Sequence, residues 1–269
     1  MPLADGFAEL ITIGGSFLSA LALAMARAMG MVMVMPIFTQ TGVTGILRTG
    51  VVIAIALSLL PFVMHELESA GRPGTPLLFA VMLKEGFVGF LLGFAFSIPF
   101  WGVQSAGDLV DFQRGLTGAT IADPSQSSEA SVTGLFLLLT MIALFFIVGG
   151  MMVVIETLYQ TYTIWPLFDF TPRLSIDNAA AIFILLDDIM RLAFVIAGPV
   201  MIAMFLGDAV LAAITRFAPQ LNVFVLSMAI KSAIFVALMP LYAVFIFGYI
   251  DDALAPLHDI AEDFRRMIR

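Results

Sequence analysis

The sequence contains no cysteine and few charged residues, and both shortages narrow what the protein can be. Without cysteine it has neither a disulfide framework nor a thiolate metal site. Only 12% of its residues are charged, whereas about a quarter are charged in a soluble globular domain. The net charge is -8, and this argues against nucleic-acid binding, which depends on lysine and arginine clusters.

The residues of common catalytic sites are also scarce. The chain has 2 histidines, and no second histidine follows His65-Glu66 at the spacing of a zinc-binding H-E-x-x-H helix. There is no phosphate-cradling G-x-x-x-x-G-K-S/T sequence and no cysteine nucleophile. Spacing does not exclude a serine hydrolase that uses His65 or His258, but nothing else supports one. We therefore expect no catalytic residue, no cofactor and no metal site.

What the chain has in excess is apolar sequence. Hydrophobic residues make up 61% of it, and its mean hydropathy is +1.06, so we expect an integral membrane protein. The first residues, MPLADGFAEL, lack the basic region of a secretory signal, and nothing looks cleavable. With 25 Phe and 17 Met but 2 Trp and 4 Tyr, the interfacial aromatic belt is thin, and many faces are expected to meet protein.

The apolar runs predict an all-α fold of about six long hydrophobic helices, because a membrane-crossing helix needs roughly 20 apolar residues. The candidate segments are about 9–35, 46–64, 76–103, 132–158, 179–214 and 222–250. The polar end, about 251–269, is interpreted as a short amphipathic surface helix. No repeat or soluble domain is evident, so the whole of 1–269 is expected to form one membrane-embedded domain.

Several ionisable residues fall within these segments, although charge is costly at bilayer depth and normally faces protein or a wet cavity. Asp187 and Asp188 lie within a helical turn of Arg191, which predicts an ion pair. Lys231 is isolated in the sixth segment, so we expect a carboxylate to hold it, either Asp208 or an acid on a neighbouring subunit. Residues near segment ends, for which snorkelling to the interface is expected, are Arg48, Lys84, Glu85 and Glu156, while Arg27 lies deeper.

Glycine and proline recur within the same segments. Gly89 and Gly93 form a G-x-x-x-G pattern that permits close helix approach, and Gly149-Gly150 interrupts the fourth segment. Prolines expected to kink or end helices are Pro61, Pro99, Pro199 and Pro240.

A polar stretch in the middle of the chain, DLVDFQRGLTGATIADPSQSSEAS (108–131), separates two long apolar runs. It could be a solvated connector or a working part. Gly115 and Gly118 would let the backbone turn tightly, and Asp123-Pro124 favours the end of a helix because a residue before proline avoids the α region.

Three stretches resemble the T component of the type III secretion export apparatus (the SctT/SpaR/YscT group), whose flagellar counterpart is FliR. They are RAMGMVMVMPIFTQTGVTGILRTGVVIAIALSLLP near the start, DLVDFQRGLTGATIADPSQ in the middle, and RFAPQLNVFVLSMAIKS before the last segment. The resemblance covers almost the whole chain. The element Pro219-Gln220-x-Asn222 is its most specific part, and SMAIKS with Lys231 looks more like the injectisome branch than the flagellar one.

This resemblance implies a non-enzymatic, multi-pass subunit of the bacterial inner membrane, with kinked and tilted helices in a hetero-oligomeric export gate. Its partners would be the R and S components, the U component, membrane lipid and the unfolded proteins that pass through the gate. The subunit would complete the ring and help to close the pore. Gate-loop positions implied by the likeness are Gln113, Arg114, Gly115, Gly118, Asp123 and Pro124; positions expected to pack against other subunits are Arg216, Pro219, Gln220, Asn222 and Lys231.

The alternative is a small-molecule or ion transporter or channel subunit, in which Asp187, Asp188 and Arg191 would line an ion path. An ordinary polar turn is the alternative for the residues around Pro219. Arg265, Arg266 and Arg269 cluster at the end of the chain, so the positive-inside bias predicts a cytoplasmic C-terminus.

Overall fold

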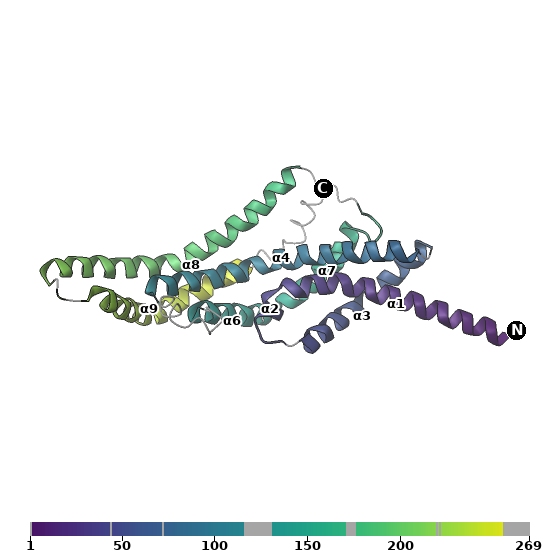
Figure 1. The fold of residues 1–269 in the computed structure, drawn as a ribbon, viewed down its shortest axis with the longest axis horizontal. Helices are drawn as coiled ribbons and strands as arrows, with labels where there is room; N and C mark the ends of the chain where they lie inside the picture. The colour runs from purple at the N-terminus through teal and green to yellow at the C-terminus, as the bar shows by residue number, and fades with distance from the viewer. Residues whose placement is uncertain are drawn as a thin grey trace. The chain divides into compact units, whose positions relative to one another are not determined.

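The computed structural model describes residues 2–43, 45–71, 73–115, 131–170, 176–218, 220 and 222–254. Every regular element in these ranges is a helix, which confirms the all-α prediction. The helices, drawn in Figure 1, are α1 (Pro2–Val34), α2 (Pro36–Thr39), α3 (Gly45–Ser69), α4 (Thr75–Arg114), α6 (Val132–Ile147), α7 (Gly150–Ile164), α8 (Ile176–Phe217) and α9 (Val223–Leu254).

Four of these helices are long and apolar enough to cross a membrane, over Gly14–Val34, Gly45–Ser69, Thr75–Arg114 and Ile189–Phe217. The pair α6 and α7 would make a fifth if the bent pair is one span, and α9 is apolar over a shorter stretch, Val225–Pro240. The predicted count of six is therefore only approximate. Helix α4 has 40 residues, about twice the roughly 20 that a membrane crossing needs.

The fourth predicted segment, 132–158, is not one helix. Helices α6 and α7 meet at a bend of 74°, where Gly149 has a φ of 81°. Glycine adopts this left-handed conformation without the steric cost that other residues incur. The apolar run continues through the bend, so hydropathy alone did not reveal it.

The third predicted segment ends too early. The apolar run stops near residue 103, but α4 continues through the polar sequence DLVDFQR to Arg114. The first part of the stretch 108–131 is therefore helical. None of the four segment prolines ends its helix, since each lies inside α3, α4, α8 or α9.

Among the described residues, the chain forms two compact units. The first contains residues up to Ser97 together with Gly149–Ile182. Its helices α1 and α4 pack with almost no side chain between them: a Cβ added to Gly89 would overlap the Arg27 carbonyl, and one at Gly93 would overlap Met31. This confirms the close helix approach predicted from Gly89 and Gly93 and identifies its partner as α1 of the same chain.

The second unit contains Ile98–Val148 and the described residues from Phe183 onward. In it α6 packs against the last part of α4, with Phe100 and Phe145 meeting edge to face at 5.4 Å between ring centroids. Helix α9 runs back beside α8 (Figure 1), and the two are joined by polar contacts from Asp208.

Candidate functional site at the end of helix α4

The end of α4 lies within the second unit, and three of the predicted gate-loop residues are found there, two in the helix and one just after it. Gln113 and Arg114 form the last turn, and Gly115 follows with a φ of 79°. All three are half-buried. The other predicted gate-loop residues, Gly118, Asp123 and Pro124, lie outside the described residues.

One turn before the end of α4, the carboxylate of Asp111 ties this helix to the start of α6. Its two oxygens accept hydrogen bonds from the Ser131 hydroxyl at 2.7 Å, and from the Thr133 backbone N–H and hydroxyl at 2.9 and 2.7 Å. Arg114 adds an ion pair at 3.0 Å, and Asp111 is only 2% exposed. Asp111 therefore holds together the two helix ends between which residues 116–130 run.

Two glycines let α4 and α6 come close enough for this contact. A Cβ added to Gly107 on α4 would overlap the backbone of Gly134 on α6, and a Cβ on Gly134 would overlap the Asp108 carboxylate. A larger residue at Gly107 would meet the backbone of α6 and push the helices apart, and Asp111 would lose its reach to the Thr133 N–H.

Helix α9 contacts the same end of α4. The Lys231 ammonium donates a hydrogen bond to the Gln113 carbonyl oxygen at 3.0 Å, and the Arg114 guanidinium lies 4.4 Å from the ring centroid of Phe235. A Cβ on Gly115 would come within 2.9 Å of the Met228 methyl. The three consecutive residues Gln113, Arg114 and Gly115 thus all contact α9.

Lys231 has the carboxylate partner that the sequence led us to expect. Its Nζ lies 2.7 Å from a carboxylate oxygen of Asp208 on α8, and the Ser227 hydroxyl donates to the other oxygen of Asp208 at 2.7 Å. The prediction that a carboxylate holds Lys231 is confirmed, with Asp208 of the same chain as the partner.

The charges in this cluster match the helix ends beside them. Lys231 lies at the C-terminal end of α4, where unpaired carbonyls carry partial negative charge, and Asp111 lies at the N-terminal end of α6, where unpaired N–H groups carry partial positive charge. Each charge also has an oppositely charged side chain, Asp208 or Arg114.

The turn between α8 and α9 carries the remaining predicted packing residues. Arg216, Gln220 and Asn222 are exposed, whereas Pro219 lies outside the described residues. The Asn222 carbonyl oxygen accepts a hydrogen bond from the Leu226 N–H at 3.2 Å, so Asn222 begins the first turn of α9.

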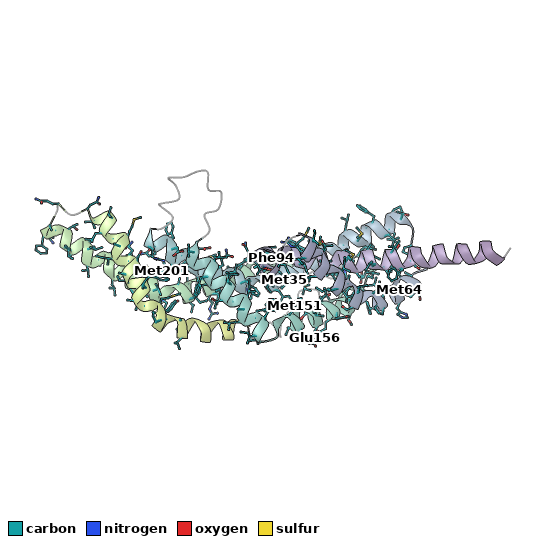
Figure 2. All side chains as sticks on the ribbon, turned by 90° about the horizontal axis from the view of Figure 1, so that it is seen from below. Met35, Met64, Phe94, Met151, Glu156 and Met201 are labelled. Carbon is teal, nitrogen blue, oxygen red and sulfur yellow. The ribbon has the colours of Figure 1, made fainter. Side chains whose placement is uncertain are left out.

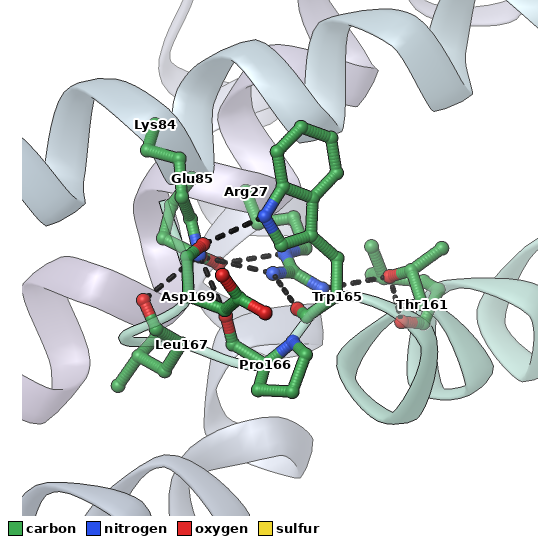
Figure 3. Close-up of polar contacts among 9 residues, drawn as sticks. Arg27, Lys84, Glu85, Thr161, Trp165, Pro166, Leu167 and Asp169 are labelled. Atoms are coloured by element: carbon green, nitrogen blue, oxygen red, sulfur yellow. Dashed lines mark hydrogen bonds and ion pairs between the residues drawn. The ribbon is translucent and has the colours of Figure 1, made fainter. Parts of the chain in front are cut away.

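A second polar cluster, in the first unit, overturns the snorkelling prediction for Lys84 and Glu85 (Figure 3). Arg27 and Glu85 are 0% exposed, and the guanidinium binds both carboxylate oxygens, at 2.6 and 2.9 Å. Arg27 also donates to the Thr161 hydroxyl at 2.9 Å and to the Trp165 carbonyl at 3.1 Å. Glu85 therefore points into the protein, because Arg27 on α1 holds it there.

Lys84 completes this buried cluster. Its ammonium lies 2.7 Å from Glu85 and donates to the carbonyl oxygens of Pro166 and Leu167, both at 2.8 Å. Two cations thus share one carboxylate, and backbone carbonyls of the residues that follow α7 supply the remaining negative partial charge. The cluster fastens the residues that follow α7 to α1 and α4 (Figure 3).

Two other charge predictions have different outcomes. Asp187 and Arg191 are both exposed, and among the described side chains no ion pair joins them, so the predicted pair between these two is wrong; the side chain of Asp188 lies outside the described part. Glu156 is exposed on α7 (Figure 2), and Arg48 is half-buried and donates to the Phe38 carbonyl at 2.8 Å.

Sequence reasoning missed Asp111, the residue with the most contacts at this site. A usable signal was present: a carboxylate three residues before Arg114, followed by Ser131 and Thr133 at the start of an apolar run, where hydroxyl residues often cap helices. Within the described ranges no group of three or more metal-ligating side chains occurs.

Comparisons with known proteins cover most of the chain. Residues 18–256 match the family described as "Bacterial export proteins, family 1". The chain is 37% identical over 227 residues to the Yop proteins translocation protein T of Yersinia pestis, covering 84% of this chain and 86% of that protein. It is 30% identical over 207 residues to the surface presentation of antigens protein SpaR of Salmonella typhimurium, covering 76% of each. It is 31% identical over 154 residues to the flagellar biosynthetic protein FliR of Bacillus subtilis, covering 56% of this chain and 59% of that protein.

Proposed function

The chain belongs to family 1 of the bacterial export proteins, the family of the type III secretion T component and FliR, and we propose that it completes the ring of the export gate. Family membership makes it a component of a type III secretion or flagellar export apparatus. With its long apolar helices, it is a multi-pass protein of the bacterial inner membrane. The family does not support the alternative of a small-molecule transporter.

We propose that the partners in this ring are the R and S components, with the U component beside them, and that unfolded secreted proteins pass through it without any catalysis by this subunit. Its surface supports a place in an assembly, because large apolar side chains are exposed along α8, among them Phe205 at 70% and Phe217 at 88%. Lipid or other subunits must cover these side chains. The exposed turn with Arg216, Gln220 and Asn222 is our proposed contact with neighbouring subunits, together with Pro219.

Within the ring, we propose that the segment beginning at Gln113 helps to hold the resting pore shut. The observation that carries this proposal is the convergence of Gln113, Arg114 and Gly115 on α9. A segment that only connects two helices would not need these contacts at its first residues. Gly118, Asp123 and Pro124 belong to the same proposed gate loop.

Deleting Gly115 to Thr120 tests the gate proposal. The sequence of this stretch is polar and contains glycine, so it has little apolar area to bury and little folding energy should depend on it. We expect the complex with the R and S components to assemble, and small ions or dyes to leak across the membrane when no substrate is present. An assembled complex without a leak would show that the stretch is only a connector. Loss of assembly would show that the subunit needs this stretch to fold.

The branch of the family is a further proposal. Identity is 37% to the Yersinia protein and 31% to the Bacillus flagellar protein over a shorter match, and we propose that this chain serves an injectisome rather than a flagellum. Deleting its gene should abolish secretion of effector proteins and leave motility intact; loss of motility alone would assign it to the flagellar branch.

A further inference from the structure

The contacts of α9 with the end of α4 lie on one face of α9. Met228, Lys231 and Phe235 are spaced by three and four residues, so they form a single stripe along the helix. Each meets a different residue of α4 or its end: Lys231 binds the Gln113 carbonyl, Phe235 lies under Arg114, and Met228 lies against Gly115. A continuous stripe of this kind fixes both the position and the rotation of the end of α4.

Each contact is of a kind that can release without unfolding a helix. Lys231 donates to a carbonyl in the last turn of α4, where the carbonyls have no partner within their own helix. The Arg114 guanidinium rests on the Phe235 ring by an attraction that weakens when the two slide apart. The partners of Asp111 are Ser131, Thr133 and Arg114, and none of them lies on α9. The end of α4 can therefore leave α9 while α4 and α6 remain clamped together.

Helix α9 is in turn fastened to α8, because Asp208 on α8 binds both Ser227 and Lys231. Displacing the pair α8–α9 would thus pull on the end of α4 through Lys231. The residue that binds α8 is the same residue that binds Gln113, so the two contacts are mechanically coupled.

We propose that the stripe Met228, Lys231 and Phe235 is a latch that holds the export gate closed, and that the end of α4 separates from α9 before a substrate passes. This inference rests on the proposed gate function. It adds the element that controls the gate, and assigns that role to three residues of α9.

A reversible cross-link between Gly115 and Met228 tests the latch. The chain has no cysteine of its own, so Gly115→Cys with Met228→Cys introduces a single possible intramolecular disulfide. A Cβ at 115 would lie 3.4 Å from the Met228 Cγ, the place that the sulfur of the cysteine introduced there would take. The two side chains therefore meet, and an S–S bond of about 2.05 Å can join them after a small adjustment of the side chains.

The experiment uses the double variant in the assembled complex, oxidised and then reduced. We expect the disulfide to form, and secretion to fall at least tenfold when oxidised and to recover with a thiol reductant. Each single-cysteine variant, treated alike, controls for the oxidant and should show no difference between the two states. If the cross-linked chain secretes as well as the reduced one, the latch is refuted; if the disulfide fails to form, the Phe235→Ala variant decides.

A second variant weakens the latch, which keeps the test decisive if a cysteine at 115 is not tolerated. Phe235→Ala removes the ring beneath Arg114 and should raise the ion leak of the resting complex several-fold at unchanged complex yield. If the Phe235→Ala complex assembles and leaks no more ions than the unaltered complex, the latch proposal is refuted. If the Gly115–Thr120 deletion leaks while Phe235→Ala does not, only the latch fails; if the deletion itself is tight, the gate proposal fails.

Discussion

The Arg27 guanidinium and the Glu85 carboxylate form a bidentate ion pair in which neither side chain is exposed. The residues are 58 positions apart and lie on α1 and α4. Lys84 also contacts Glu85, so a single carboxylate neutralises two buried cations. Removing the carboxylate should therefore destabilise the protein more than removing the guanidinium.

Glu85→Gln should destabilise the protein more than Arg27→Met does. The glutamine leaves both Arg27 and Lys84 without a carboxylate, and breaking a buried pair costs about 3–5 kcal/mol, whereas Arg27→Met leaves Glu85 paired with Lys84. The measurement is the thermal unfolding midpoint and yield of the purified complex. Glu156→Gln, which removes a charge from an exposed position, is the matched control and should change neither. Equal losses for Glu85→Gln and Arg27→Met would contradict this account.

Lys231→Met should impair assembly or secretion, and Lys231→Arg should be partly tolerated. Methionine leaves Asp208 without its cation and Gln113 without its donor, and losing a hydrogen bond to a charged group costs about 2 kcal/mol. Arginine keeps the charge and can reach both acceptors. Co-purification with the R and S components and secretion of a reporter measure the effect. Normal assembly and secretion by the methionine variant would show that this pair is dispensable.

Asp111→Asn should loosen the start of α6. Ser131 and the Thr133 N–H donate to one oxygen of Asp111, and the Thr133 hydroxyl and Arg114 donate to the other. Asparagine keeps one carbonyl oxygen and replaces the other acceptor by a donor, so it cannot accept from both sets of donors. The expected readout is faster amide hydrogen exchange at 131–134. Asp187→Asn, an exposed acid on α8, is the control and should leave this exchange unchanged. Unchanged protection in the Asp111 variant would mean that the carboxylate does not hold the two helix ends.

The C-terminus should lie in the cytoplasm, because Arg265, Arg266 and Arg269 supply the strongest local cluster of positive charge. A fluorescent protein fused after Arg269 should therefore fluoresce, while alkaline phosphatase at the same position should be inactive. Active phosphatase would place this end in the periplasm and refute the positive-inside prediction.

The sequence by itself determined the membrane class, the all-α fold, the family and most of the helix positions. These follow from properties that are local along the chain: runs of apolar residues long enough to span lipid, and ordered stretches such as that around Pro219. It also singled out Lys231, because one cation in an apolar helix requires a carboxylate wherever the helix packs.

Only the tertiary structure decided which groups meet. Hydropathy placed Glu85 near a segment end and so predicted snorkelling, but its direction depends on Arg27, which lies on another helix. The sequence showed that Gly149-Gly150 interrupts the fourth segment, but it did not predict a bend of 74° there, because the apolar run continues on both sides. In the sequence, Asp111 is one more polar residue of a connector. In the structure, α4 continues past it and its carboxylate accepts a hydrogen bond from Thr133 of α6. Pairing across helices depends on distances in space, which the order of residues along one helix does not contain.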